Sequence, residues 1–322
     1  MRGISVKKFG GPEVLTMDNN LKVPTYNDDQ LLIKVSAAGV NPVDTIVRSG
    51  NFPPPPPLPY TPGFDGAGVV ENVGKNVKNF KVGDRVLITS GQGSGTYAEY
   101  AVTTPLFVAH LGSKLSFEEG AGIGIPYYTA YKTLCILVRA RAGETVLVHG
   151  ASGAVGIASV QLAKSIGLKV IGTAGTSEGM KLVKDNGADV VFNHRDKDYV
   201  KKITDSVPEG IDIILEMLAN VNLDKDLDMI KLRGRIGIIG CRDEVKIAAK
   251  KIMFKEIVVT GVLIFLSTEA EWKEMHGAIE AGIKSGWLKP HIGLKYPLAQ
   301  APKAHDTVMN NPGTMGRIVV QI

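Results

Sequence analysis

Residues 146–156 read VLVHGASGAVG and have the composition of a nucleotide-binding turn. The apolar run 146–148 predicts a buried parallel strand, and the pattern of 157–166 predicts a helix. A glycine-rich turn between a strand and a helix presents free backbone N–H groups, and the positive end of the helix dipole faces the same point. The chemistry predicted for this segment is therefore the binding of a phosphate group.

The glycine spacing of this turn departs from the usual dinucleotide fingerprint, G-x-G-x-x-G. In the matching register, 151–156, the first position is Ala151, although Gly150 before it can relax the turn. Gly153 would let the backbone approach a pyrophosphate, and Gly156 would let the helix pack closely on the strand. The flanking strand and helix favour a dinucleotide site over the alternative, a tight turn without a ligand.

The next predicted strand, 169–172, indicates which dinucleotide is bound. An NAD site places Asp or Glu about 20 residues beyond the turn, where the acid binds the ribose 2′-OH. Residues 172–176 read GTAGT and contain no acid, so nothing there would repel a 2′-phosphate. We therefore expect NADPH to be preferred over NADH. The basic side chains that could bind the 2′-phosphate are Lys181, His194 and Arg195, each of which is otherwise an exposed, solvated charge.

The elements that position this turn alternate between strands and helices, which predicts a doubly wound parallel sheet. Its six expected strands are 146–149, 170–172, 190–192, 211–216, 235–240 and 257–262. The chain up to about residue 123 reads instead as short strands separated by glycine turns, with the proline run 53–57 as an exposed loop. After the sheet we expect a helix, a loop over 290–297, a second helix and a final strand over 317–321.

A chain of 322 residues predicts two domains. We expect a nucleotide-binding domain over 124–265, inserted into a β-rich domain made of 1–123 and 266–322. The net charge of +5 suits anionic ligands and would permit weak RNA binding, although a solvated basic surface is the simpler explanation. The two cysteines, Cys135 and Cys241, agree with a reducing compartment. With no signal peptide and no span for a membrane, we expect a cytoplasmic protein.

Several stretches along the whole chain match one known family. They are FGGPEVL (9–15), GVNPVD (39–44), PYTPG (59–63), GAGV (66–69), VGDRV (82–86), GIPYYTAY (124–131), the glycine turn and EMLANVN (216–222). On these stretches the chain resembles the medium-chain dehydrogenase/reductase superfamily, and within it the zeta-crystallin type of quinone oxidoreductase. The resemblance implies an α/β fold with a GroES-like β-rich catalytic domain, a six-stranded doubly wound Rossmann domain and a cleft between them. It also implies NADPH-dependent reduction of ortho- and para-quinones in that cleft, with one-electron products.

The same resemblance implies where the cofactor and substrate bind. The implied cofactor contacts are Ser152, Gly153, Ala154 and Val155 at the phosphates, Gly175 and His194 near the adenosine, then Asn222, Ile239, Gly240, Cys241 and Arg242, and finally Val262, Leu263 and Ile264 on the nicotinamide side. Asn41 is the best candidate for a hydrogen-bond donor beside the nicotinamide, with Tyr60 and Thr129 as weaker candidates. Asn41 could instead be a turn residue and Tyr60 a packing residue. One contact departs from the family, because relatives have a tyrosine where this chain has Ile46.

Zinc is a second point on which the chain departs from part of the superfamily. Alcohol dehydrogenases of the superfamily hold a catalytic zinc with Cys, His and Cys or Glu. The matching positions here read AGVN (38–41) and GFDG (63–66), and the two cysteines lack ligand spacing. Because zinc needs three or four converging N, S or O ligands, we expect no metal. A quinone accepts electrons without such a Lewis acid, whereas simple alcohol oxidation becomes disfavoured.

Two other functions stay open from the sequence. Reduction of α,β-unsaturated carbonyls needs a proton donor near the substrate α-carbon, often a tyrosine, and no tyrosine lies in 41–52. The resemblance also allows a non-catalytic role, as a structural crystallin or an AU-rich RNA-binding protein. The resemblance further implies that the protein is a homodimer or homotetramer, formed through the last strand of the Rossmann sheet, 257–263.

Overall fold

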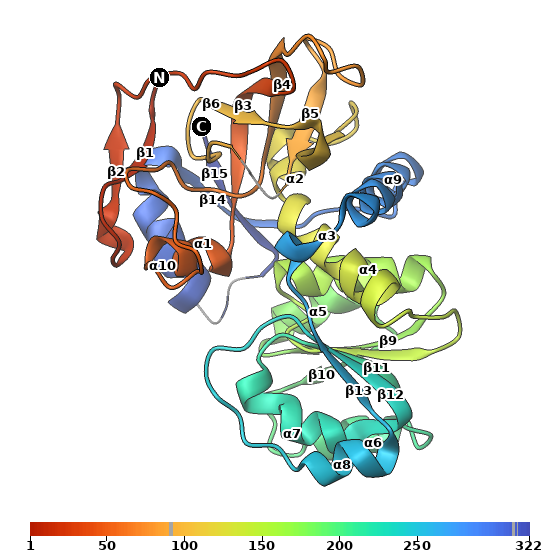
Figure 1. Ribbon diagram of the computed structural model, residues 1–322. Helices are drawn as coiled ribbons and strands as arrows, with labels where there is room; N and C mark the ends of the chain where they lie inside the picture. Colours follow the sequence, from red (N-terminus) through yellow and green to blue (C-terminus); the bar gives the residue numbers. More distant parts are fainter. Residues whose placement is uncertain (90–92, 311–312, 314) are drawn as a thin grey trace. The chain divides into compact units, whose positions relative to one another are not determined.

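The computed structural model describes residues 1–89, 93–310, 313 and 315–322 and divides the chain into two compact units (Figure 1). Unit 1 combines Met1–Ile125 with Thr268–Ile322, and unit 2 is Pro126–Ser267. The units therefore meet in the sequence at 125/126 and 267/268, and the predicted boundaries, 123/124 and 265/266, lie two residues earlier. One unit is therefore inserted into the other along the sequence.

Unit 2, which is described throughout, contains a six-stranded sheet in the order β10-β9-β8-β11-β12-β13. The strands are β8 (Thr145–Val148), β9 (Lys169–Ala174), β10 (Val190–Asn193), β11 (Ile211–Glu216), β12 (Ile230–Ile238) and β13 (Val258–Gly261), and neighbouring strands are parallel. In order of appearance this is 3-2-1-4-5-6, so the predicted doubly wound Rossmann sheet is confirmed. The strand order reverses between β8 and β11, which makes their carboxyl ends the switch point where such sheets bind ligands.

Helices connect the strands of unit 2. They are α4 (Ala154–Ser165), α5 (Ser177–Asp185), α6 (Tyr199–Ser206), α7 (Ala219–Met229) and α8 (Ala249–Lys255). Every residue of β11 is buried, so both faces of this central strand are covered, as its continuous apolar run predicts. The core beneath the helices includes Leu147, Ile171, Ile214 and Ile236. Strand β12 begins five residues before the predicted 235, because Ile230 already pairs with Ile211 ahead of an irregular register at Arg235.

The described residues of unit 1 form a mostly antiparallel sheet in the order β14-β15-β3-β4-β5-β7, with β6 paired to β3, and a separate β1-β2 ribbon. The strands are β1 (Gly3–Val6), β2 (Leu15–Asp18), β3 (Leu31–Val40), β4 (Gly66–Val73), β5 (Arg85–Ile88), β6 (Tyr100–Thr103), β7 (Val108–His110), β14 (Ile292–Pro297) and β15 (Arg317–Gln321). Strand β15 pairs antiparallel with β3, so the end of the chain completes the sheet begun near its start (Figure 1).

The other elements of unit 1 are mainly short helices. They are α1 (Pro42–Arg48), α2 (Phe117–Ala121), α9 (Glu269–Ser285) and α10 (Ala301–Asn310), with single 3-10 turns at Pro12–Val14, Pro105–Phe107 and Leu298–Gln300. Helix α3 (Gly124–Tyr131) crosses the boundary between the units and continues as a π-helical turn, Lys132–Leu137, and a further 3-10 turn, Ile264–Leu266, lies in unit 2. The loop predicted over 290–297 is wrong, since 292–297 pairs with β15 as strand β14. Of the helices in the described chain, none combines the length and apolarity needed to cross a bilayer.

Candidate functional site

The glycine turn joins the carboxyl end of β8 to the start of α4. Gly150 has φ +54°, a left-handed conformation that favours glycine, and Gly153 is the N-cap of α4. A Cβ atom at Gly156 would lie 2.5 Å from the Gly150 carbonyl oxygen and 2.6 Å from Ala151 Cα, so Gly156 permits close packing of helix and turn. At Gly153, by contrast, the only described atom that a Cβ would meet within 4 Å is the Gly150 oxygen, at 3.4 Å.

Alanine at the first fingerprint position is accommodated by the neighbouring strand. Ala151 is fully buried, and its N–H donates to the Thr173 carbonyl of β9 at 2.8 Å. A Cβ atom at Gly172 would lie 3.1 Å from the Ala151 methyl group, so the extra carbon of alanine occupies space that glycine leaves on β9. The imperfect fingerprint is therefore compatible with the turn that a dinucleotide needs, and Ser152, Gly153, Ala154 and Val155 remain only partly buried.

The structure brings Gly175, His194 and Arg195 together beyond the ends of β9 and β10. A Cβ atom at Gly175 would lie 2.7 Å from His194 Nε2 and 2.9 Å from Arg195 Nε, so both basic side chains stand against this backbone. Burial, followed by the charges of His149 and Arg195, lowers the pKa of His194. Among the described residues no carboxylate pairs with Arg195, whereas Lys181 pairs with Asp185 at 2.6 Å. The arrangement fits a 2′-phosphate bound by His194 and Arg195 and leaves Lys181 engaged elsewhere.

The remaining predicted cofactor residues in unit 2 surround the switch point. Ile239 and Gly240 follow β12, and their N–H groups donate to the Glu216 carbonyl oxygen at 2.8 and 3.2 Å. Asn222 in the first turn of α7 donates to Glu216 Oε1 at 3.3 Å. The exposed Cys241 and Arg242 come next in the chain, and Val262, Leu263 and Ile264 follow β13. These segments and the open space over Gly153 fit a dinucleotide lying across the carboxyl ends of the strands.

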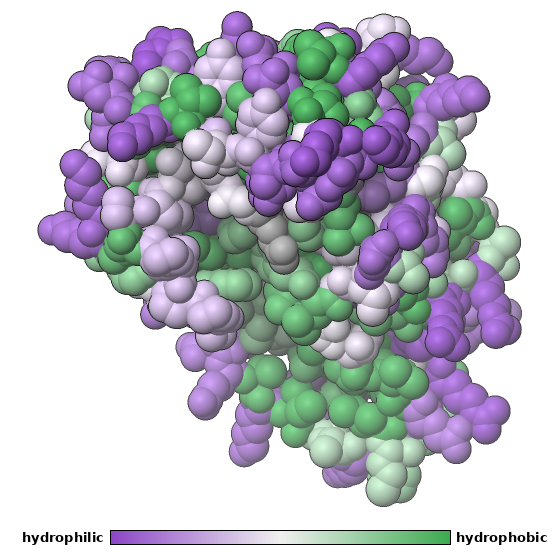
Figure 2. Space-filling view, turned by 45° about the horizontal axis from the view of Figure 1, so that its top comes forward, coloured by the Kyte–Doolittle hydropathy of each residue, from purple (hydrophilic) through white to green (hydrophobic). Residues whose placement is uncertain are grey.

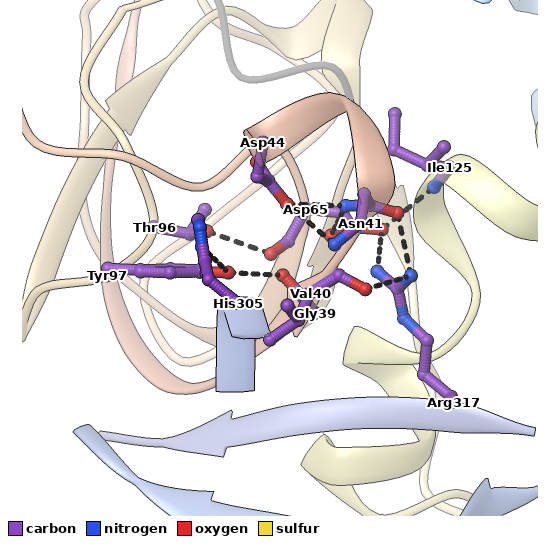
Figure 3. Close-up of polar contacts among 10 residues, drawn as sticks. All are labelled: Gly39, Val40, Asn41, Asp44, Asp65, Thr96, Tyr97, Ile125, His305 and Arg317. Carbon is purple, nitrogen blue, oxygen red and sulfur yellow. Dashed lines mark hydrogen bonds and ion pairs between the residues drawn. The ribbon is translucent and has the colours of Figure 1, made fainter. Parts of the chain in front are cut away.

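In unit 1, Asn41 lies in a buried polar network (Figure 3). Its side-chain amide donates to Asp65 Oδ1 at 2.9 Å and to Asp44 Oδ2 at 3.1 Å, and its Oδ1 accepts from Arg317 Nη1 at 2.6 Å. Both amide hydrogens are thus engaged inside the unit. The prediction that Asn41 presents a free donor to the nicotinamide does not agree with these contacts; we interpret Asn41 as a positioning residue that holds Asp44.

Asp65 and Arg317 form the centre of this network. Arg317 Nη2 donates to Asp65 Oδ2 at 2.6 Å, and the Ile125 N–H donates to the same oxygen at 2.9 Å. The side chains of Asp65 and Arg317 are 0% and 4% exposed, so this ion pair is closed to water. Gly39 is required beside it, because a Cβ atom there would collide with the Arg317 guanidinium. At the far side, Tyr97 and His305 continue the network through a 3.2 Å contact (Figure 3).

At the positions where the resemblance to zinc-containing alcohol dehydrogenases would place metal ligands, this chain carries residues that do not fit the metal. Phe64 has no ligand atom, and the Asp65 carboxylate is already bonded to Arg317, Asn41 and the Ile125 N–H. An asparagine, a phenylalanine and an ion-paired aspartate are not a zinc donor set. A zinc-free site stays a prediction.

Asp44 and Tyr60 border a cavity of about 510 Å³ in unit 1. Its other described walls are mainly apolar and include Phe52, Phe64 and prolines of the 53–57 loop and its flanks. The buried Asp44 Oδ1 and Tyr60 hydroxyl have no hydrogen-bond partner among the described residues. Burial, then the nearby Asp65 charge, raises the pKa of Asp44 to about 7, and burial raises the pKa of Tyr60 to about 12. The cavity therefore combines apolar walls with two groups able to donate a hydrogen bond.

The third predicted catalytic residue, Thr129, belongs to unit 2, whereas Asn41 and Tyr60 belong to unit 1. It is buried in the part of α3 that belongs to unit 2, and its carbonyl accepts from Thr133 Oγ1 at 2.6 Å. Sequence reasoning missed Asp44, Asp65 and Arg317. Asp44 carried a local signal, because its carboxylate accepts from the Asn41 N–H at the start of α1, three residues earlier. Arg317, 276 residues from Asn41, carried none.

Comparison with known proteins agrees with this geometry. Residues 27–113 match the alcohol dehydrogenase GroES-like domain, and residues 154–281 match the family described as zinc-binding dehydrogenase. The quinone oxidoreductase of Homo sapiens is 50% identical over 321 residues, covering 99% of this chain and 97% of the relative. The solved structure of Escherichia coli quinone oxidoreductase complexed with NADPH is 28% identical, with a TM-score of 0.90 over the full length of both chains. An NAD-dependent alcohol dehydrogenase structure is also 28% identical, with a TM-score of 0.92 over both full lengths.

A GroES-like unit with an inserted Rossmann unit defines the medium-chain dehydrogenase/reductase class, and the matches to both domain families agree. Within that class, about half of the residues are identical to those of the human quinone oxidoreductase over nearly the full length of both chains. The chain belongs to the quinone oxidoreductase family.

Proposed function

We propose that the protein is an NADPH-dependent quinone reductase that works without zinc. The observation that carries the proposal is the 50% identity over 99% of the chain to proteins named quinone oxidoreductase. Bound NADPH would supply the reducing equivalents. The residues that would hold it are the turn 152–155, the basic pair His194 and Arg195, and the segments after β12 and β13. The protein's own contribution is to align the reactants and to stabilise charge on the quinone oxygen.

The direct test follows NADPH absorbance with purified protein and a panel of ortho-quinones, para-quinones and enones. We expect rapid oxidation of NADPH with quinones, slower oxidation with enones, and rates that a metal chelator leaves unchanged. Enones that react faster than every quinone would favour the alternative function, in which the Tyr60 hydroxyl beside the cavity would be the proton donor. An absence of oxidation with all quinones would contradict the proposal.

Arg195→Ala is expected to lower the affinity for NADPH by about tenfold or more and to leave the affinity for NADH unchanged. A hydrogen bond between charged groups contributes about 1.5–3 kcal/mol, and NADH lacks the 2′-phosphate that Arg195 would bind. Isothermal titration with both cofactors at one salt concentration measures the effect. Lys201→Ala is the matched control, since Lys201 pairs with Asp205 and is not a predicted cofactor residue, and it should change neither affinity. Equal losses for both cofactors would show that Arg195 does not read the 2′-phosphate.

The cavity of unit 1 has walls that suit a quinone substrate. A quinone is a flat apolar ring with carbonyl oxygens at its edge, which match apolar walls and two hydrogen-bond donors. The raised pKa of Asp44, about 7, means that its carboxyl group is protonated below that pH and ionised above it. Tyr60, with a pKa of about 12, stays protonated across the working range. We infer that protonated Asp44 and Tyr60 hold the quinone oxygen.

This inference predicts that kcat with a quinone falls as pH rises through about 7, because the Asp44 donor is lost there. Asp44→Asn should remove that fall, because the amide donates at every pH. Tyr60→Phe should lower kcat by about tenfold while the pH-dependent fall remains, since one donor of about 1.5 kcal/mol is removed. Rates measured from about pH 5.5 to 8.5 test both variants, and a fall of unchanged size in Asp44→Asn would exclude Asp44.

We also infer that two copies of the chain pair along β13. This strand is bonded to β12 on one side, and its other edge has no partner in the described chain. Val258, at the start of this strand, is 54% exposed, and Met253 and Phe254 of the preceding helix are 66% and 73% exposed. Apolar side chains, in green, also gather on the face of the molecule that Figure 2 shows. Light scattering tests this: a mass of the 34.4 kDa monomer would contradict it, and an even multiple would support it.

A further inference from the structure

A buried cluster of three ionisable side chains lies under the switch point of unit 2. His149 directly follows β8, Glu216 ends β11 and Asp226 lies in α7, and their ligand-type atoms all lie within 4.8 Å of one another. His149 Nε2 is 2.8 Å from Asp226 Oδ1 and 3.6 Å from Glu216 Oε2. The side chains are 3%, 0% and 0% exposed, so water does not solvate their charges.

The two carboxyl groups of the cluster cannot both be ionised. Glu216 Oε2 and Asp226 Oδ2 are buried without a hydrogen-bond partner in the described chain. Two adjacent carboxylates closed to water cannot both carry charge, so one proton shared between them relieves the repulsion and gives an unpartnered oxygen a partner. Burial raises the pKa of Glu216 and of Asp226 to about 7, while burial lowers the pKa of His149.

The cluster is linked to three of the segments that the cofactor would use. His149 directly precedes Gly150, where the glycine turn begins. Glu216 Oε1 accepts from the Leu218 N–H and from the Asn222 amide, which places the first turn of α7. The Glu216 carbonyl accepts from the N–H groups of Ile239 and Gly240. One buried unit therefore supports the glycine turn, Asn222 and the loop after β12.

We propose that His149, Glu216 and Asp226 form one proton-sharing unit that positions the three cofactor-binding segments, so that NADPH affinity depends on the proton the unit holds. The proposal rests on the proposed function, because NADPH is the ligand concerned. When the shared proton leaves, two like charges face each other beneath the turn, and the segments that they hold are pushed apart. None of the three side chains is assigned a contact with the reacting atoms; they act through the backbone they support.

Other ionisable groups face the unit and must be separated from it. Lys225 of α7, Tyr199 of α6 and His194 after β10 interact electrostatically with its members. These three groups and the 2′-phosphate of NADPH are unchanged in a variant of Glu216. A difference in the pH dependence of NADPH affinity between the variant and the original protein therefore comes from the proton-sharing unit.

Glu216→Gln tests the proposal, since the amide keeps an oxygen for Leu218 and Asn222 and mimics the protonated acid. In the original protein we expect the Kd for NADPH to rise above about pH 7, by at most about tenfold per pH unit for one proton. In Glu216→Gln this rise should be absent. Asp224→Asn, on the same helix but half-exposed and bonded to Lys251 and the Ala248 N–H, is the matched control and should keep the rise. If Glu216→Gln keeps the original pH dependence, the proposal is overturned.

A measurement without cofactor separates this proposal from the proposed function. Because the pKa values of Glu216 and Asp226 are raised in the folded state, folded protein holds more protons than unfolded protein between about pH 4.5 and 7, and the free energy of unfolding falls as pH rises through that window. We expect a shallower fall in Glu216→Gln, with Asp226→Asn as a second variant if the first does not fold. If the free energy of unfolding falls with pH as steeply in both variants as in the original protein, the proton-sharing unit is overturned. It is also overturned if the protein binds one transition-metal ion per chain and His149→Ala loses that ion. NADPH that fails to bind at any pH would overturn the proposed function instead.

Discussion

Gly153→Val is expected to abolish NADPH binding while the temperature of unfolding stays within a few degrees of the original. The backbone at Gly153 is extended, with φ −79° and ψ 174°, which valine adopts readily. The new Cβ would meet only the Gly150 oxygen at 3.4 Å among the described atoms, so the fold has room for it. The valine methyl groups would occupy the space through which a pyrophosphate reaches the turn.

The expected loss in NADPH affinity is at least about a hundredfold. Displacing the phosphates from two backbone N–H donors removes two hydrogen bonds to a charged group, at about 1.5–3 kcal/mol each. Gly156→Val gives the opposite pattern, because its Cβ would collide with Gly150 and Ala151 and the protein should fail to fold. Gly277→Ala in α9, where a Cβ meets nothing within 4 Å among the described residues, is the silent control. Titration and thermal unfolding of all three decide the matter, and normal NADPH affinity in Gly153→Val would exclude the turn as the phosphate site.

Arg317→Leu is expected to lower the free energy of unfolding by about 3–5 kcal/mol, because it leaves the Asp65 carboxylate buried without its cation. Asp65 is completely buried, and the bonds that remain to it, from Asn41 and the Ile125 N–H, are neutral. The loss should be accompanied by lower kcat, since Asn41 loses the Arg317 bond that orients it and, through it, Asp44. Urea unfolding measures the stability and the quinone assay measures the rate.

Two comparisons make this prediction specific. Lys201→Gln breaks an exposed ion pair with Asp205, whose side chains are 77% and 61% exposed, and should change stability by less than about 0.5 kcal/mol. The double variant Asp65→Asn with Arg317→Leu should be less destabilised than the sum of the single variants, because the uncompensated charge is gone. Additive losses would mean that the two side chains do not act as a pair.

Local patterns in the sequence predict most of unit 2. Each strand is a short apolar run, and the alternation of strands and helices specifies a parallel sheet with few alternative orders. The glycine turn and the missing acid after β9 are equally local, because a turn needs glycine where backbone or phosphate comes close. The predicted loop over 290–297 failed for the complementary reason: β14 becomes a strand only because β15 lies beside it.

The local residue pattern is enough to predict a dinucleotide turn, the missing acid for a ribose hydroxyl, and the missing zinc ligands that alcohol dehydrogenases of the superfamily carry. The folded chain adds three facts that the pattern does not contain: Asn41 has both amide hydrogens engaged, Asp44 and Tyr60 border one cavity, and His149, Glu216 and Asp226 meet under the switch point. The physical reason is the range of the contacts. Helix and strand periodicity repeats every few residues and can be read along the chain, whereas a buried polar contact joins single residues such as Asn41 and Arg317, 276 positions apart.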